Sequence, residues 1–186
     1  MEEQVVLVDA YDSEIGTIGK MDAHSDGGKL HRGISIFVFN KKGELMLQQR
    51  ADSKYHSGGL WTNTTCGHPL RGESPVATAH RKIVQEMGFD CEMYESFSTT
   101  YHADVGNGLS EWEFLHVIFG VYDGEPRLNQ DEAKAWKWIR LYALKKDVKK
   151  NPSSYSAWLR IILNQVIKHF NEDISLQKRS SSGFGK

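Results

Sequence analysis

The sequence contains little cysteine and no long apolar segment. Two cysteines, Cys66 and Cys91, among 186 residues are too few for a disulfide framework, which favours a reducing compartment and free thiols. The first ten residues, MEEQVVLVDA, lack a basic leader, and their apolar run is too short for a signal peptide or a membrane span. We therefore expect a cytoplasmic protein without a membrane partner.

The chain also carries almost no net charge. Its 23 basic and 24 acidic residues give a formal net charge of -1. Such a balance creates no overall field that would draw the protein onto nucleic acid or anionic membranes. We expect a small-molecule partner, no nucleic acid, and a monomer or weak homodimer.

The overall composition is typical of one globular domain. Hydrophobic residues make up 39% and aromatic residues 11% of the chain, enough to form a core without covalent staples. Near the C-terminus, Lys178–Gly183 is polar and rich in serine, which is typical of a disordered tail. We predict a single domain over residues 1–172 and a tail over residues 173–186.

Alternating and apolar runs predict several strands. A long Gly- and Asp-rich stretch over residues 9–32 is predicted to be a functional loop. Asn40–Gly43 has the composition of a hairpin turn between two of the strands. The predicted strands are Gln4–Val8, Ile34–Phe39, Glu44–Gln49, Phe97–His102, Glu111–Tyr122 and Ala135–Ile139.

Two segments have helical composition. In Ser74–Met87, Ser74 suits the N-cap, Pro75 the first helical position, and Gly88 the left-handed stop after the last turn. The second predicted helix is Ser153–Phe170. Helices among several strands predict a compact α+β domain in which helices flank mixed β-sheets.

The segment from Gly67 to Phe89 has a specific spacing. Five residues separate Gly67 from Glu73, and seven separate Glu73 from Arg81. This spacing resembles the Nudix box, whose loop and helix hold a divalent cation against a diphosphate. Lys82 and Gln85 stand where Nudix hydrolases carry glutamates, so the resemblance implies the frame without the hydrolytic metal cluster. From spacing alone, Lys82 is equally well explained as half of a surface pair with Glu86.

A second motif directly precedes this box. The segment Trp61–Pro69, WTNTTCGHP, closely resembles the active-site motif of the type 1 isopentenyl-diphosphate isomerases, a family with a Nudix fold. Glu111-Trp112-Glu113 resembles the catalytic Glu-x-Glu of that family, and Tyr101 falls where the family has an essential tyrosine. The resemblance extends from about residue 4 to about residue 170, and it implies conversion of isopentenyl diphosphate to dimethylallyl diphosphate.

The resemblance also implies two metal sites and an anchor for the diphosphate. Glu86 and the main-chain carbonyl of Cys66 would hold Mg²⁺ together with the substrate. Zn²⁺ or Mn²⁺ would be bound by His24, His31, His68, Glu111 and Glu113. The diphosphate would be bound by Arg50 and Lys54, which match family positions, and we expect Lys20, Lys82 and Arg81 to take part as further cations.

Taken without the family, the same residues still form a plausible site. Glu111 and Glu113 would project from one face of a strand, although an isolated Glu-x-Glu is more often on a solvated face. Imidazole and carboxylate together suit a first-row transition metal, although an isolated histidine is more often a surface or hydrogen-bonded residue. Cys91 is interpreted as a core residue. No ligand position is matched by His56, His80, His102, His116 or His169.

The implied reaction explains these residue types. An alkene is a very weak base, so it needs a well-placed acid, a stabilised cationic state and the exclusion of water. We expect Glu113, with Tyr101 and the metal, to protonate the alkene. We expect Cys66 to remove the allylic proton, as a thiolate stabilised by a positive group or metal. Trp158 would face the cationic carbon, and Trp61 is a second candidate.

Two other functions share some of these features. A Nudix hydrolase of a nucleoside diphosphate derivative would use the same frame, but Lys82 and Gln85 argue against it. A structural zinc module would need about four ligands, typically rich in cysteine, and here only Cys66 is near the histidines.

Overall fold

A computed structural model of the chain describes residues 3–173, so the predicted tail lies outside the described residues apart from Asp173. The described part contains a mixed sheet and four α-helices, which confirms the α+β class. The helices are α1 (Lys20–His24), α2 (Pro75–Met87), α3 (Leu141–Lys150) and α4 (Ala157–Glu172), and a 3₁₀ turn covers Pro152–Ser154. The strands are β1 (Gln4–Val8), β2 (Glu14–Gly19), β3 (His31–Phe39), β4 (Glu44–Arg50), β5 (Trp61–Thr62), β6 (Thr65–Gly67), β7 (Glu92–Gly106), β8 (Leu109–Val121) and β9 (Ala133–Arg140).

Strand β3 lies at the centre of the sheet. It pairs in parallel with β8 from His31, opposite Glu113, to Phe39, opposite Val121, and antiparallel with β6 along Cys66. The long strand β7 then pairs antiparallel with β8, which places Tyr101 opposite Glu113. These pairings bring residues far apart in the sequence onto neighbouring strands.

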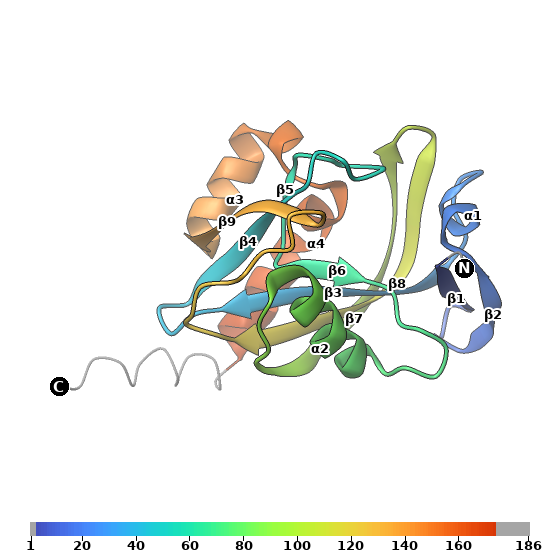
Figure 1. Cartoon of the computed structure of the whole chain (residues 1–186), viewed down its shortest axis with the longest axis horizontal. Helices are drawn as coiled ribbons and strands as arrows, with labels where there is room; N and C mark the ends of the chain where they lie inside the picture. The colour runs from blue at the N-terminus through green and yellow to red at the C-terminus, as the bar shows by residue number, and fades with distance from the viewer. Residues whose placement is uncertain (1–2, 174–186) are drawn as a thin grey trace.

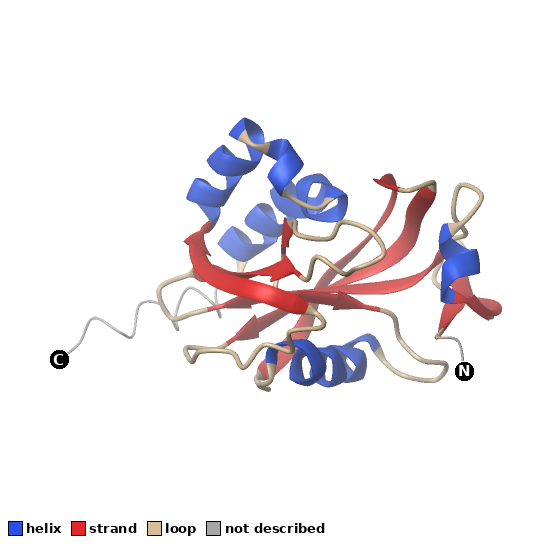
Figure 2. Cartoon of the chain, turned by 45° about the horizontal axis from the view of Figure 1, so that its top comes forward, coloured by secondary structure: helices blue, strands red, loops and turns tan. Residues whose placement is uncertain are grey.

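Helices cover both faces of the sheet. Helices α3 and α4 lie on one side and α2 on the other (Figures 1 and 2). One core cluster joins the sheet to α3 and α4 through residues such as Leu144 and Leu159, and a second joins it to α2 through Ile83 and Met87. The result is a three-layer domain.

The predicted Nudix-box helix is confirmed. The Ser74 hydroxyl accepts a hydrogen bond from the Ala77 amide at 3.2 Å, and Pro75 is in the first turn. Gly88 ends the helix in a left-handed conformation with φ 70°. These groups satisfy main-chain atoms that a helix leaves free at its ends.

The predicted loop over residues 9–32 was wrong in its extent. Strand β2 and helix α1 occupy much of it, because β1 supplies a pairing partner from Gln4, opposite Gly19, to Val8, opposite Glu14. The sequence analysis also missed α3, whose N-terminus has no side-chain cap. Both errors have the same cause, since these elements are stabilised by tertiary contacts rather than by strong local patterns.

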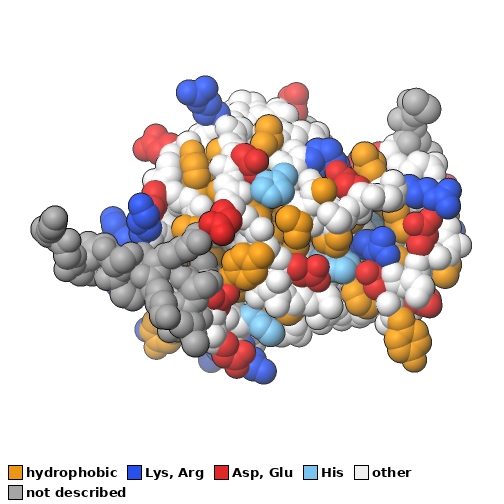
Figure 3. All heavy atoms as spheres, turned by 90° about the horizontal axis from the view of Figure 1, so that it is seen from below, with side chains coloured by type: hydrophobic (Ala, Val, Ile, Leu, Met, Phe, Trp, Pro, Cys, Tyr) orange, Lys and Arg blue, Asp and Glu red, His pale blue; other side chains and the backbone are white. Residues whose placement is uncertain are grey.

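The surface agrees with the balanced composition. Acidic and basic side chains are interspersed over the face shown in Figure 3. Within residues 3–173, no helix has the length and apolar character needed to cross a membrane.

Candidate functional site

A cavity of about 330 Å³ lies between the edge of the sheet and the N-terminal part of α4. Strands β3, β6, β7 and β8 supply one wall, and helix α2 with the loop between β4 and β5 supplies another. Its lining includes Cys66, His68, Tyr101, Glu113 and Trp158. The cavity therefore combines predicted acid–base groups, metal ligands and an aromatic wall.

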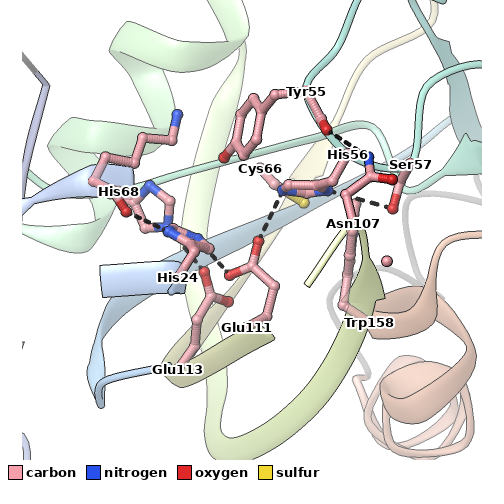
Figure 4. Close-up of polar contacts among 12 residues, drawn as sticks. His24, Tyr55, His56, Ser57, Cys66, His68, Asn107, Glu111, Glu113 and Trp158 are labelled. Atoms are coloured by element: carbon pink, nitrogen blue, oxygen red, sulfur yellow. Dashed lines mark hydrogen bonds and ion pairs between the residues drawn. The ribbon is translucent and has the colours of Figure 1, made fainter. Parts of the chain in front are cut away.

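Four of the five predicted transition-metal ligands form one compact cluster. Ligand atoms of the buried residues His24, His31, His68 and Glu111 all lie within 4.8 Å of one another. The fifth, Glu113, borders this cluster, with its Oε1 3.0 Å from His68 Nε2 and 3.8 Å from His31 Nε2. Figure 4 shows His24, His68 and both glutamates converging.

The hydrogen bonds of this cluster fit a bound cation. His24 Nδ1 is 2.6 Å from the Lys20 carbonyl and His31 Nδ1 is 2.7 Å from the Lys29 carbonyl. A carbonyl only accepts, so both Nδ1 atoms carry hydrogen and both Nε2 atoms present lone pairs. With a neutral ring, His24 Nε2 would face the carboxylate of Glu111 at 2.9 Å as one acceptor against another. Although burial opposes it, the hydrogen bond to Glu111 raises the pKa of His24, so a proton joins the two atoms when no metal is bound. A cation can take the place of this proton, and the outer hydrogen bonds from Nδ1 are typical of metal-binding histidines.

Burial lowers the pKa of two of these imidazoles. Burial, followed by the neighbouring His68, lowers the pKa of His31 to about 4. Burial likewise lowers the pKa of His68 to about 3. Both rings are therefore neutral at pH 7, which is the form that binds metal ions.

The two glutamates of β8 differ in their protonation. Burial, followed by the charge of Glu111, raises the pKa of Glu113 to about 8. Although burial opposes ionisation of Glu111 too, hydrogen bonds from His24 and His56 hold its pKa well below the usual value. Tyr101 donates its hydroxyl to Glu113 Oε2 at 2.8 Å. Without a bound cation, Glu113 is thus a protonated acid near neutral pH, next to an anionic Glu111, and a cation at the cluster would lower its pKa.

Neutral polar groups surround the thiol of Cys66. In the described part of the chain, the polar groups contacting its Sγ are the Ser35 hydroxyl at 3.3 Å and the Asn63 side-chain amide at 3.2 Å. Neither carries positive charge. Burial raises the pKa of the thiol to about 12, so in these neutral surroundings the resting group is a thiol, and a bound cation would favour the thiolate.

Trp158 is fixed relative to the thiol through one amide. Its indole Nε1 donates to Asn63 Oδ1 at 3.2 Å, and the Nδ2 of the same Asn63 is 3.2 Å from Cys66 Sγ. Asn63 is completely buried. The structure therefore brings together the predicted cation-stabilising ring and the predicted base.

Basic residues and acidic partners surround another part of the cavity. Lys20 Nζ is 2.9 Å from the Glu3 carboxylate and Lys54 Nζ is 2.6 Å from that of Glu132. The guanidinium of Arg50 lies over Trp158, 5.3 Å from the ring centroid. All six of these side chains line the cavity, so an anionic ligand there would compete with the two carboxylates for the amines.

The Nudix-box helix contributes Lys82 and Glu86. Lys82 Nζ is 2.9 Å from Glu86 Oε1, and the Thr65 hydroxyl donates to Glu86 Oε2. Lys82 is thus a half-buried cation facing the cavity rather than half of a surface pair. Gln48 donates to Glu86 at 3.1 Å, but its own Oε1 is buried without a hydrogen-bond partner among the described residues. An unsatisfied oxygen beside a carboxylate fits a hard cation.

Two predicted substrate-binding residues are placed differently. Arg81 lines the cavity, but its guanidinium is held by the Glu73 carboxylate at 2.6 and 2.8 Å and by the His68 carbonyl at 3.2 Å. Trp61 lines a separate hollow, where Lys137 Nζ lies 4.1 Å from its ring centroid. The structure therefore places Arg81 as a support for the His68 loop and does not bring Trp61 to the cavity.

The sequence analysis missed one buried residue at the site. It assigned no site role to His56, yet His56 Nε2 lies 3.2 Å from Glu111 Oε1 and its side chain is almost fully buried. His56 lies between β4 and β5, where no periodic pattern exists. Its position two residues after Lys54 was the signal available in the sequence.

Comparisons with known proteins agree with this geometry. The NUDIX domain family model matches residues 29–159. An isopentenyl-diphosphate Delta-isomerase 2 of Aromatoleum aromaticum is 53% identical over 90% of this chain and 88% of its own length. An isopentenyl-diphosphate Delta-isomerase of Serratia proteamaculans is 45% identical over 89% of this chain and 92% of its own length.

Solved structures support the fold. A crystal structure of a Deinococcus radiodurans protein has a TM-score of 0.73 at 18% identity, covering 88% of this chain and 98% of that one. A MutT protein from Methanosarcina mazei has a TM-score of 0.60 at 16% identity, covering 77% and 94%. The relatives and the family model show that the chain belongs to the isopentenyl-diphosphate Delta-isomerase family within the Nudix fold.

Proposed function

We propose that this enzyme isomerises isopentenyl diphosphate to dimethylallyl diphosphate in isoprenoid biosynthesis. The single observation that carries this function is the placement of Glu113 and Cys66 in one cavity that also contains Trp158. Two proton-carrying groups and an electron-rich ring are what movement of a double bond through a tertiary cation requires. Hydrolysis of a diphosphate forms no carbocation, so it does not require an electron-rich ring between two proton-transfer groups.

Glu113 adds the proton to the terminal alkene carbon, and Cys66 removes the allylic proton. Of the two groups, Glu113 is the stronger acid, with a pKa of about 8 against about 12 for the thiol. The thiolate is correspondingly the stronger base. Because Cys66 rests as a thiol, it releases its proton to solvent before it accepts the allylic proton, and the Glu113 carboxylate takes up a proton from solvent after the alkene has been protonated. Tyr101 holds the Glu113 carboxyl through its hydroxyl.

Trp158 stabilises the positive charge between these two groups. A desolvated cation over an indole face gains on the order of 2 kcal/mol. The ring is only 4% exposed and its nitrogen is fixed by Asn63. The face of Trp158 therefore offers electron density without a nucleophile that would capture the cation.

Two metal ions complete the site. We assign Zn²⁺ or Mn²⁺ to His24, His31, His68, Glu111 and Glu113, because imidazole with carboxylate suits both metals. We assign Mg²⁺ to Glu86 and the Cys66 carbonyl, because it is commonly held by one or two carboxylates and substrate phosphates. When bound, these cations supply positive charge next to the acid and to the diphosphate.

The diphosphate binds to the basic residues of the cavity. Lys20, Lys54 and Lys82 exchange their carboxylate partners for phosphate oxygens, and Arg50 adds a planar donor group. Binding energy at this end then orients the alkene between Glu113 and Cys66. Arg81 contributes indirectly, because its guanidinium donates a hydrogen bond to the main-chain carbonyl of His68.

The activity is tested by incubating the purified enzyme and divalent metal with isopentenyl diphosphate, followed by product analysis by nuclear magnetic resonance. We expect dimethylallyl diphosphate without release of phosphate. Phosphate release from nucleoside diphosphate derivatives, with no isomer formed, would favour the Nudix-hydrolase alternative instead. We further propose that the enzyme works in the cytoplasm as a monomer or weak homodimer.

A further inference from the structure

His56 occupies a buried position between the His/Glu ligand cluster and Trp158. It belongs to the loop joining β4 and β5 and is 4% exposed. It is not a member of the compact ligand cluster. In Figure 4 its ring lies on the far side of Glu111 from His24.

The Glu111 carboxylate divides its two oxygens between these histidines. Oε2 is 2.9 Å from His24 Nε2, inside the cluster, and Oε1 is 3.2 Å from His56 Nε2, outside it. A carboxylate oxygen accepts hydrogen bonds, so His56 Nε2 is placed to donate one. With Oε1 held in this way, Oε2 is the oxygen left to face the metal position.

The other contacts of His56 favour the tautomer that carries its hydrogen on Nε2, and they hold the ring in place. Nδ1 lies 3.3 Å from the Ser57 hydroxyl, which can donate to it and leave the hydrogen on Nε2. The ring also meets Trp158 edge to face, with centroids 5.7 Å apart at 86°. Neighbouring Tyr55 is anchored through its carbonyl, which accepts from Asn107 at 3.1 Å.

We infer that His56 is a positioning residue that holds Glu111 as a one-oxygen metal ligand through a hydrogen bond from its Nε2. This inference rests on the metal site of the proposed function. Hydrogen bonds to the outer oxygen of a ligand carboxylate commonly change metal affinity by about 10- to 100-fold. His56 therefore tightens binding of the transition metal without contacting the substrate's diphosphate.

Three substitutions of His56 distinguish the effect of its hydrogen bond to Glu111 from the effect of its packing. His56→Gln places an amide donor where Nε2 is, His56→Asn places its shorter amide near the position of Nδ1, and His56→Phe keeps a ring without a donor. His80→Phe is the matched control, because His80 pairs with Asp90 at the surface. Each full-length variant is stripped of metal and titrated with Zn²⁺ against a competing chelator, and kcat and KM are then measured.

We expect His56→Phe and His56→Asn to bind Zn²⁺ about 10- to 100-fold more weakly, and His56→Gln to stay within about threefold of wild type. KM for isopentenyl diphosphate should remain unchanged, whereas a merely structural role in the β4–β5 loop, which carries Lys54 and follows Arg50, would raise it. Wild-type zinc affinity in both His56→Phe and His56→Asn would overturn the inference, as would a raised KM with unchanged affinity.

If His56→Phe does not fold, His56→Asn carries the same test. Failure of the proposed function would show separately, as a zinc-loaded wild type that forms no isomer.

Discussion

The carboxylate of Glu113 lies directly against Gly33, where a Cβ atom would come within 2.5 Å of its Oε1. Gly33 is on β3 between His31 and Ser35, and alternate residues of a strand point to the same face. His31 therefore reaches the His/Glu ligand cluster and Ser35 reaches Cys66, while Gly33 leaves the space that Glu113 occupies.

Gly33→Ala should displace the acid without removing any functional group. A misplacement of about 1 Å at a reacting group costs about 100-fold in rate, and we expect kcat to fall by that order. Steady-state kinetics and thermal unfolding of the same preparation are the measurements. Wild-type kcat in a folded Gly33→Ala enzyme would show that Glu113 need not stay where the structure places it.

Cys66→Ala should lower kcat by about 10²- to 10⁴-fold, the usual contribution of a general acid or base. Cys91→Ala is the matched control, because Cys91 packs at the edge of the α2-side core, away from the cavity. Comparable loss in both variants, at unchanged stability, would show that the thiol of Cys66 has no special role.

Glu113→Gln and Glu111→Ala should separate protonation from metal binding. Glu113→Gln keeps an oxygen beside the cluster but cannot deliver a proton, so bound metal should persist while turnover falls by about 10²- to 10⁴-fold. Glu111→Ala should lose both. Elemental analysis of purified protein together with turnover checks this, and full metal content in Glu111→Ala would contradict the ligand assignment.

Much of this site could be predicted from the sequence because its groups lie in short motifs. The Trp61–Pro69 motif contains Cys66 and His68, and the spacing of two between Glu111 and Glu113 already places both on one face of a strand. The α2 helix was equally predictable, since its caps are local.

Other parts of the site depend on contacts that no local pattern records. His56 gains its position from the fold of the β4–β5 loop over Glu111. The hydrogen bond between the Cys66 thiol and the Ser35 hydroxyl depends on β3 pairing with β6. Strand β2 and helix α1 were missed for the same reason, because β2 pairs with β1 and His24 of α1 contacts Glu111 of β8, both outside the segment.

Trp158 should contribute through its ring face. Loss of a cation–π interaction of about 2 kcal/mol in Trp158→Ala corresponds to about a 30-fold fall in kcat. Trp158→Phe should lose less, because a phenyl face is a weaker version of the same surface. An analogue with a tertiary ammonium in place of the cationic carbon should bind the alanine variant more weakly than wild type, and equal binding to both would remove this role.

The most direct test of the mechanism is the fate of solvent deuterium. If Glu113 adds a proton to the terminal alkene carbon, then isopentenyl diphosphate converted in deuterated water should yield dimethylallyl diphosphate with deuterium in the newly formed methyl group. Prolonged incubation should also exchange the allylic position, because the reverse reaction returns a proton through Cys66. Mass spectrometry and deuterium nuclear magnetic resonance of the product read both positions. Product that forms at the normal rate but contains no solvent deuterium would contradict protonation by Glu113 and the cationic mechanism with it.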